Sequence, residues 1–263
     1  MTIDIASFET RLRALEALPF NVELQRQDSF SAPDGWHLDA SEVALPTEAP
    51  GEPEAHGAFR AAQEVLRDYR FPPPDLITGI FLPDAPLHER VMLLRARFLF
   101  FTFWFGVRIT AVIDAVRGAG DDAERVWGYR YATLDGHFER GEIEFVVTKS
   151  LATGVVRFKI SSFSQTAKIT NIFIRIGFSL FGRRLQQRFA RESLRRMQVL
   201  VDEALTTGRR IGAAPPVLPA ASDEKASEML EKHLPSSSSS LSSASSSSAS
   251  LPSASSSSAS SSS

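Results

Sequence analysis

A histidine and several carboxylates lie close together in the middle of the chain. His137 is preceded by Asp135 and followed by Glu139, Glu142 and Glu144. Because imidazole titrates near neutral pH, a histidine that is oriented by a carboxylate can act as a general acid or base. His137, Glu142 and Glu144 are therefore candidate catalytic residues. The alternatives are that these residues contact a ligand or only complete a turn between two strands, with Gly136 and Gly141 supplying unusual backbone angles.

The same group does not predict a metal site. Its spacing, His-x-Glu-x-x-Glu-x-Glu, matches no known arrangement of metal ligands. The chain has no cysteine, which excludes disulfides, thiol catalysis and thiolate ligands. The sequence also has no phosphate-binding glycine loop and no Ser/His/Asp pattern. No metal and no cofactor are therefore predicted.

Three aromatic residues precede this group at intervals of two. Trp127, Tyr129 and Tyr131 share one face of a predicted strand, since side chains alternate along a strand. Phenol groups on such a face can orient the polar end of a ligand. Trp127, Tyr129, Tyr131 and His137 are therefore candidate ligand-binding residues. Ordinary packing between neighbouring strands is the alternative.

Arginines recur along the C-terminal part of the chain. Arg184, Arg188, Arg191 and Arg195 fall within about 60° of one another on a helix. Such a face can bind an anionic lipid surface or another anionic partner, and the alternative is a solvated helix face. Nucleic acid is not an expected partner, because the net charge is −2 and the pI is near 6.2.

The elements that would position these residues follow from the periodicity of the apolar side chains. Alternation predicts strands over residues 91–100, 107–114, 126–134, 142–148 and 156–162. Short turns between consecutive strands indicate an antiparallel meander. A stripe at helical spacing predicts a long final helix that ends at Gly208. The stripe consists of Phe178, Phe181, Leu185, Phe189, Met197, Leu200 and Ala204.

The N-terminal third gives weaker signals. Helices are predicted over 8–18 and 59–69, and 29–55 is predicted to be a long irregular connection because it is dense in Pro, Asp, Glu and Gly. The aromatic run over 98–107 is half the length of a membrane span, and Gly106 within it is predicted to mark a bend or bulge. No transmembrane segment and no signal peptide are predicted, and a cytoplasmic location is expected.

Together these patterns predict an α+β fold in which a curved antiparallel sheet wraps around a long amphipathic C-terminal helix. Any space between the sheet and the helix would be an apolar cavity. The Pro- and Ala-rich linker and the serine-rich tail have too little apolar surface to fold. The expected organisation is an N-terminal helix and irregular extension over 1–55, a single domain over 56–210, a linker over 211–234 and a disordered tail over 235–263.

A family resemblance rests on the central segment. Gly128-Tyr-Arg-Tyr-Ala-Thr-Leu-Asp-Gly-His137, followed by Gly141-Glu142 and Phe145, resembles the pattern Gly-x-x-Tyr-x-Thr-Leu-x-Gly-His…Gly-Glu…Phe of the bacterial and plant DUF1990 family. The similarity extends over roughly residues 56–205. It implies a relation to the START-like, helix-grip (SRPBCC) proteins, which often hold an apolar ligand. It implies no established activity.

Three functional hypotheses follow. The leading one is a binding module for a small apolar or amphipathic ligand, with Tyr129, Tyr131 and His137 near the ligand's polar end. The second is an enzyme in which Glu142 or Glu144 orients His137 as acid or base. The third is a peripheral membrane or partner-docking protein that acts through the arginine-rich helix.

Overall fold

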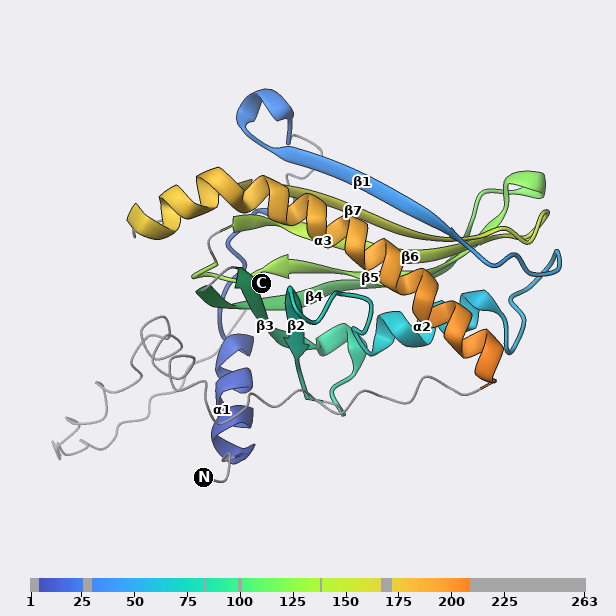
Figure 1. Ribbon diagram of the computed structural model, residues 1–263, viewed down its shortest axis with the longest axis horizontal. Coiled ribbons are helices and arrows are strands. Elements are labelled where there is room, and N and C mark those ends of the chain that lie inside the picture. The colour runs from blue at the N-terminus through green and yellow to red at the C-terminus, as the bar shows by residue number, and fades with distance from the viewer. Residues whose placement is uncertain are drawn as a thin grey trace, which may run out of the picture.

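The computed structural model describes residues 5–25, 30–82, 84–98, 101–137, 139–166 and 172–208. Within these ranges, seven strands form one antiparallel sheet in the order β1-β7-β6-β5-β4-β3-β2 (Figure 1). The strands are β1 (His37–Leu45), β2 (Ile77–Ile80), β3 (Val91–Phe98), β4 (Phe101–Arg117), β5 (Glu124–Thr133), β6 (Glu139–Ser150) and β7 (Val156–Thr166). The helices are α1 (Ile5–Glu16), α2 (Ala58–Arg67) and α3 (Ile172–Thr207), with short 3-10 turns η2 (Ala32–Asp34), η3 (Leu87–Glu89) and η4 (Gly120–Asp122).

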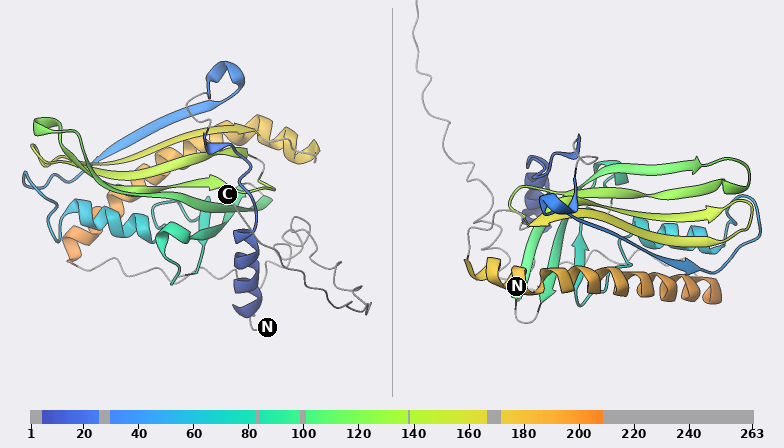
Figure 2. Two further views of the ribbon diagram at one scale, coloured as in Figure 1. Left: turned by 180° about the vertical axis from the view of Figure 1, so that it is seen from behind. Right: turned by 90° about the horizontal axis from the view of Figure 1, so that it is seen from above.

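The long helix α3 runs across the concave face of the curved sheet, and α2 lies on the same face beside it (Figures 1 and 2). The main core fills the space between these helices and the sheet, and its largest members include Phe71, Phe145 and Phe158. Helix α1 packs on the opposite face, where Leu12 and Leu15 cover part of β3. The predicted α+β fold, a helix-grip-like sheet with a long C-terminal helix, is confirmed.

The segment 29–55 contains a strand, so the prediction of one irregular connection was wrong for residues 37–45. Strand β1 pairs antiparallel with β7 along its whole length and extends the sheet at one edge. Its alternation is hard to detect because the outward positions are exposed and two of the four inward ones, Asp39 and Ser41, are polar, so that only Val43 and Leu45 carry the apolar signal. Polar edge strands of this kind protect a sheet from pairing with other chains.

The aromatic run forms part of the β3–β4 hairpin, in which Arg95 pairs with Trp104. Strand β4 continues through Gly106 and its register shift lies later, between Ile109 and Ala111, so a bulge at Gly106 was a wrong prediction. A Cβ atom at Gly106 would lie 3.1 Å from the side-chain tips of Leu15 and Leu134. This glycine therefore lets α1 approach the sheet. The short strand β2 was not predicted.

The end of α3 agrees with the sequence. Gly208 has a left-handed φ of 61°, and its N–H donates to the carbonyl of Ala204 at 3.0 Å, which closes the last turn. In the part of the helix whose side chains are described, Phe189, Met197 and Leu200 are buried. The side chains of 172–182, with Phe178 and Phe181, and the predicted linker and tail lie outside the described residues. No helix in the described ranges has the length and apolar character needed to cross a membrane.

Candidate functional site

A cavity of about 530 Å³ lies between α3 and the concave face of the sheet. Its size falls within the range of small-molecule sites, roughly 300–1,000 Å³. The apolar part of its wall comes from central strands and from the helix, and it includes Leu94, Val107, Ile143, Ile160 and Phe189. The cavity exists because alternate residues of β3 to β7 face inward while α3 crosses above them.

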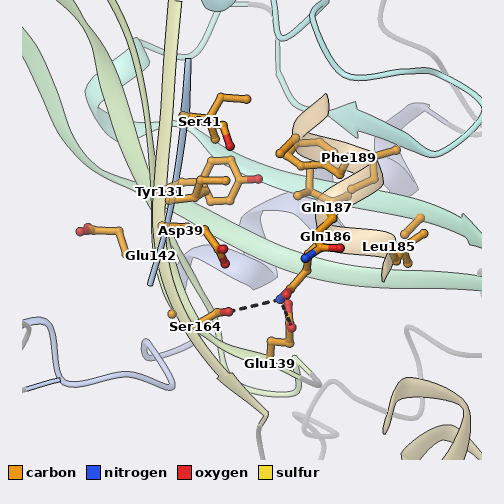
Figure 3. A pocket seen from close by; sticks show the side chains of 18 of the residues that line it. Asp39, Ser41, Tyr131, Glu139, Glu142, Ser164, Leu185, Gln186, Gln187 and Phe189 are labelled. Carbon is orange, nitrogen blue, oxygen red and sulfur yellow. Dashed lines mark hydrogen bonds between the residues drawn. The ribbon is translucent and has the colours of Figure 1, made fainter. Parts of the chain in front are cut away.

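One group of polar side chains interrupts this apolar wall. Gln186 of α3 donates hydrogen bonds from Nε2 to the carboxylate of Glu139 on β6 and to Oγ of Ser164 on β7, the latter at 3.2 Å (Figure 3). Nearby, the guanidinium of Arg183 pairs with Asp39 of β1, with Nη2 and Oδ1 2.6 Å apart. These contacts connect the helix to three strands at one end of the cavity.

Within this cluster, burial affects the ionisation of Glu139 more than that of the other titratable groups. Loss of hydration raises the pKa of Glu139 to about 7, although the bond from Gln186 and the charge of Arg183 act in the opposite direction. The carboxyl group can therefore exchange a proton near neutral pH. By contrast, the bond from Arg183 lowers the pKa of Asp39, which stays ionised.

A pair of tyrosines contributes a second polar group. The hydroxyl of Tyr131, on β5, lies 3.2 Å from the hydroxyl of Tyr69, which follows α2. Tyr131 lines the cavity and Tyr69 supports it from behind. Burial raises the pKa of both phenols above the ordinary value, so both are neutral at physiological pH.

His137 also lines the cavity, in the turn between β5 and β6. Its Nδ1 accepts the backbone N–H of Glu139 at 2.8 Å, and its ring packs edge-on against Phe105 at a centroid distance of 4.2 Å. Burial lowers the pKa of His137 to about 3, so the imidazole is neutral at physiological pH. The bond from the Glu139 N–H fixes the turn.

The family model described as a domain of unknown function, DUF1990, matches residues 21–196, which is more than half of the chain. The chain belongs to the DUF1990 family. The match includes β1 and starts earlier than the region over which the sequence motif suggested a resemblance. None of the curated proteins matches this DUF1990 chain in sequence.

Solved structures with similar folds have little sequence identity to the DUF1990 protein. The structure of TTHA0849 from Thermus thermophilus is 13% identical, with a TM-score of 0.41, covering 64% of this chain and 99% of that one. The structure of Ara h 8.0201 is 13% identical, with a TM-score of 0.38 and coverages of 64% and 99%. The Zhui aromatase/cyclase from Streptomyces sp. R1128 is 15% identical, with a TM-score of 0.38 and coverages of 68% and 100%.

In the DUF1990 protein, the two candidate carboxylates lie on the convex face of β6, opposite to Glu139. Figure 3 shows the side chain of Glu142 extending away from the side on which Gln186 lies. Glu142 accepts a hydrogen bond from Thr110 at 2.5 Å, and Glu144 pairs with Arg130 at 2.7 Å. The structure therefore does not bring these two carboxylates together with His137.

Two of the three candidate aromatic residues lie away from the cavity. Trp127 is covered by Arg67, whose guanidinium carbon lies 5.6 Å from the ring centroid, and Tyr129 donates to the carbonyl of Leu66 at 3.0 Å. Both contacts are with α2, which covers this part of the sheet. Of the four predicted ligand-binding residues, Tyr131 and His137 line the cavity, and Trp127 and Tyr129 do not.

The four arginines of the predicted anionic site have different surroundings. Arg188 pairs with Glu192 at 2.8 Å and with Asp75 at 3.1 Å. Arg191 and Arg195 are exposed and line the cavity, and Arg184 is exposed. One member of the stripe is therefore already neutralised within the DUF1990 protein, and binding to an anionic surface remains a prediction.

Of the two glutamates that sequence reasoning selected, Glu142 borders the cavity although its carboxylate extends to the other face of β6, and Glu144 does not line it. Glu139, Gln186 and Arg183 were not selected. The period of β6 contains the missing signal, because Glu139 shares its face with Ile143 and Phe145, whereas Glu142 and Glu144 alternate with them. The periodicity gives no such signal for Gln186, since its place depends on how α3 is rotated against the sheet. Among the described residues, no group of three or more His, Asp or Glu could hold a metal ion.

The glycines of the family motif have structural roles. Gly136 has a left-handed φ of 86° in the turn between β5 and β6. Gly128 and Gly141 allow close contact between strands, because a Cβ atom would lie 2.0 Å from the carbonyl oxygen of Phe145 and 2.2 Å from that of Phe163, respectively. Much of the motif that identifies a DUF1990 protein therefore specifies strand packing and a turn.

Replacing Gly128 by alanine is expected to lower the free energy of unfolding by about 1–3 kcal/mol, because the methyl group meets backbone atoms of β6. Urea denaturation would measure the change. Gly106→Ala is the matched control, since its methyl group would meet only the movable tips of Leu15 and Leu134. Equal losses in the two variants would contradict the role assigned to Gly128.

Proposed function

We propose that this protein binds a small apolar or amphipathic molecule in the cavity between α3 and the sheet. The observation that carries the proposal is the cavity itself, about 530 Å³ in volume, with a mainly apolar wall that a few groups of polar side chains interrupt. Binding sites commonly combine a mainly apolar wall with a few fixed polar groups that orient the ligand.

The polar end of the ligand would lie beside Glu139, Ser164 and Gln186, and its apolar part against Ile143, Ile160 and other central residues. Glu139 and Gln186 already hold one another, so their positions are fixed before a ligand arrives. Tyr131 and His137 line the same space. This placement moves the polar end of the ligand away from Tyr129, where the sequence had suggested it.

Ligand binding can be tested without knowing the ligand. Native mass spectrometry of freshly purified protein would detect a retained molecule, and a panel of lipids and other small apolar compounds would be screened by thermal denaturation. A ligand at 100 times its Kd stabilises the folded state by about 2.7 kcal/mol, which raises the melting temperature. If no molecule is retained and no compound raises the melting temperature, the proposal is wrong.

Two neighbouring serines on β7 provide a test of where the ligand lies. Ser162 lines the cavity, whereas Ser161 faces the opposite side of the sheet. Ser162→Phe is expected to fill part of the cavity and to weaken binding at least about tenfold, equivalent to about 1.4 kcal/mol. Ser161→Phe adds the same side chain outside the cavity and is expected to leave the affinity unchanged. Titration calorimetry with a ligand found in the screen would compare them, and equal weakening would place the ligand elsewhere.

A further inference from the structure

The edge strand β1 and the helix α3 are joined at two places. At one of them, Nη2 of Arg183 and Oδ1 of Asp39 are 2.6 Å apart. At the other, Nε2 of Gln198 donates to the carbonyl of Ala44 at 3.0 Å. One side of the cavity lies between these two contacts. The residues of β1 and α3 that line it there are Ser41, Val43, Gln187, Arg191, Leu194 and Arg195.

Two arginines on this side of the cavity are exposed and have no acidic partner. Arg191 and Arg195 are four residues apart on α3, so their side chains are neighbours on the helix surface. Within the described parts of the chain, neither guanidinium forms an ion pair or a side-chain hydrogen bond. The carboxylate nearest to both in sequence, Glu192, is held by Arg188 at 2.8 Å. We call Arg191 and Arg195 the rim arginines.

The acidic side chains that line the cavity do not neutralise the rim arginines. Asp39 is paired with Arg183, and Glu139 is held by Gln186 at the other end of the cavity. The side chain of Glu142 extends away from the side on which Gln186 lies (Figure 3). The wall beside the rim arginines therefore carries an excess of positive charge, which an anionic group of a ligand would balance.

The two ends of the cavity accept different chemical groups. Nine residues separate Gln186 from Arg195, which is roughly 14 Å along the helix at about 1.5 Å per residue. An anion beside Gln186 would face the carboxyl group of Glu139, so the polar group bound there has to be neutral. A ligand that reaches both ends is therefore neutral at one end and anionic at the other.

We propose that the ligand of this cavity is an amphipathic acid whose anionic head group is bound by Arg191 and Arg195, with its apolar chain inside the cavity and a neutral polar group beside Glu139. Guanidinium groups suit this task, because their planar N–H donors match the two oxygens of an acid group. The inference rests on the proposed function, since it requires the cavity to hold a ligand, and it adds the chemical class of that ligand.

A charged membrane surface is the other partner that an arginine-rich helix can bind. The surroundings of the four arginines favour the cavity ligand. Arg188 is already paired with Glu192 and with Asp75, and Arg184 does not line the cavity. The two arginines that remain border the same cavity, where one head group can reach both.

The probes are 10-hydroxydecanoic acid and 1,10-decanediol, which have the same chain length and differ at one end only. Titration calorimetry with the full chain at about pH 7.5, where the acid is ionised, would compare their affinities. The acid is expected to bind at least about tenfold more tightly than the diol. Raising the salt concentration is expected to reduce this preference, because the rim arginines are exposed.

Arg191→Gln and Arg195→Gln are each expected to weaken binding of the acid about fivefold, since exposed charge pairs contribute modestly. Neither change is expected to alter the affinity for the diol. Arg184→Gln is the matched control, because it removes the same charge from the same helix outside the cavity. Its affinity for both probes is expected to equal that of the unmodified protein. Melting temperatures would establish that each variant is folded.

The outcomes separate the two proposals. If the diol binds as tightly as the acid, or if other compounds raise the melting temperature and the acid does not bind, the inference is wrong and ligand binding stands. Equal weakening by Arg184→Gln and Arg191→Gln also overturns it. Sedimentation with phosphatidylglycerol vesicles, combined with equal affinity for acid and diol, would assign the arginines to a membrane surface instead. If no compound binds, both proposals are wrong.

Discussion

Replacing Lys149 by methionine is expected to lower the free energy of unfolding by about 3–5 kcal/mol, because a buried carboxylate then loses its cation. Lys149 is fully buried on β6, and its Nζ lies 2.7 Å from Oε2 of Glu48 and 2.9 Å from the carbonyl of Glu52. Glu48 also accepts the N–H of Phe59 at 2.7 Å, in the first turn of α2. The ion pair therefore ties the start of α2 to the sheet. Urea denaturation would measure the loss.

An exposed ion pair on the neighbouring strand provides the control. Arg157 and Glu42 are 3.3 Å apart, with 40% and 54% of their side chains exposed. Arg157→Met is expected to cost less than about 1 kcal/mol, since solvent screens such pairs. Adding Glu48→Gln to Lys149→Met is expected to recover part of the loss, because the amide remains an acceptor for Phe59 without a charge. If Lys149→Met lowers the free energy of unfolding no more than Arg157→Met does, the ion pair between Lys149 and Glu48 does not tie α2 to the sheet as described.

The strands and helices whose apolar side chains repeat regularly could be predicted from the sequence. Strands β3 to β7 each bury one face under helices, so alternation is visible, and the stripe on α3 follows from its contact with the sheet. Strand β1 lies at an edge, where pairing with β7 supplies backbone hydrogen bonds and few large apolar side chains are needed. Its polar sequence therefore resembled that of a loop.

The candidate site was harder to predict, because it depends on contacts between distant segments. Trp127 and Tyr129 share a face with Tyr131, but α2 covers the first two and leaves the third beside the cavity. Nothing near these residues in sequence indicates where α2 packs. The glutamate that faces the cavity could have been chosen from the sequence, because the alternation of side chains along β6 places Glu139 and Glu142 on opposite faces of the strand.

Glu139 and His137 are expected to change stability with pH in opposite directions. Burial raises the pKa of Glu139 from 4.5 to about 7, so the folded state retains a proton that the unfolded chain releases. The unfolding free energy therefore falls as pH rises from about 4.5 to 7. Burial lowers the pKa of His137 from 6.5 to about 3, so the unfolded chain binds a proton that the folded state does not. The unfolding free energy that the neutral His137 contributes is therefore lost as pH falls from about 6.5 to 3.

Between these limits the two effects on the free energy of unfolding oppose one another, so each is isolated by comparing the unmodified protein with the variant in which that residue is replaced. Relative to the unmodified protein, Glu139→Gln is expected to gain up to about 3 kcal/mol in unfolding free energy between pH 4 and pH 8. His137→Gln is expected to gain up to about 3 kcal/mol between pH 7 and pH 4, in addition to any fixed cost of losing its ring contacts. Urea denaturation at a series of pH values gives both differences, and groups common to all variants cancel.

The stability of the Glu139→Gln variant reports how well the carboxylate of Glu139 is hydrated in the folded protein. A carboxylate that is poorly hydrated in the folded protein destabilises the fold above neutral pH. Glu139→Gln is therefore expected to give a protein that is more stable than the unmodified protein at pH 8, as occurs where a binding site is formed at the expense of stability. A difference in stability that does not vary with pH would mean that Glu139 is hydrated in the folded protein and has an ordinary carboxylate pKa.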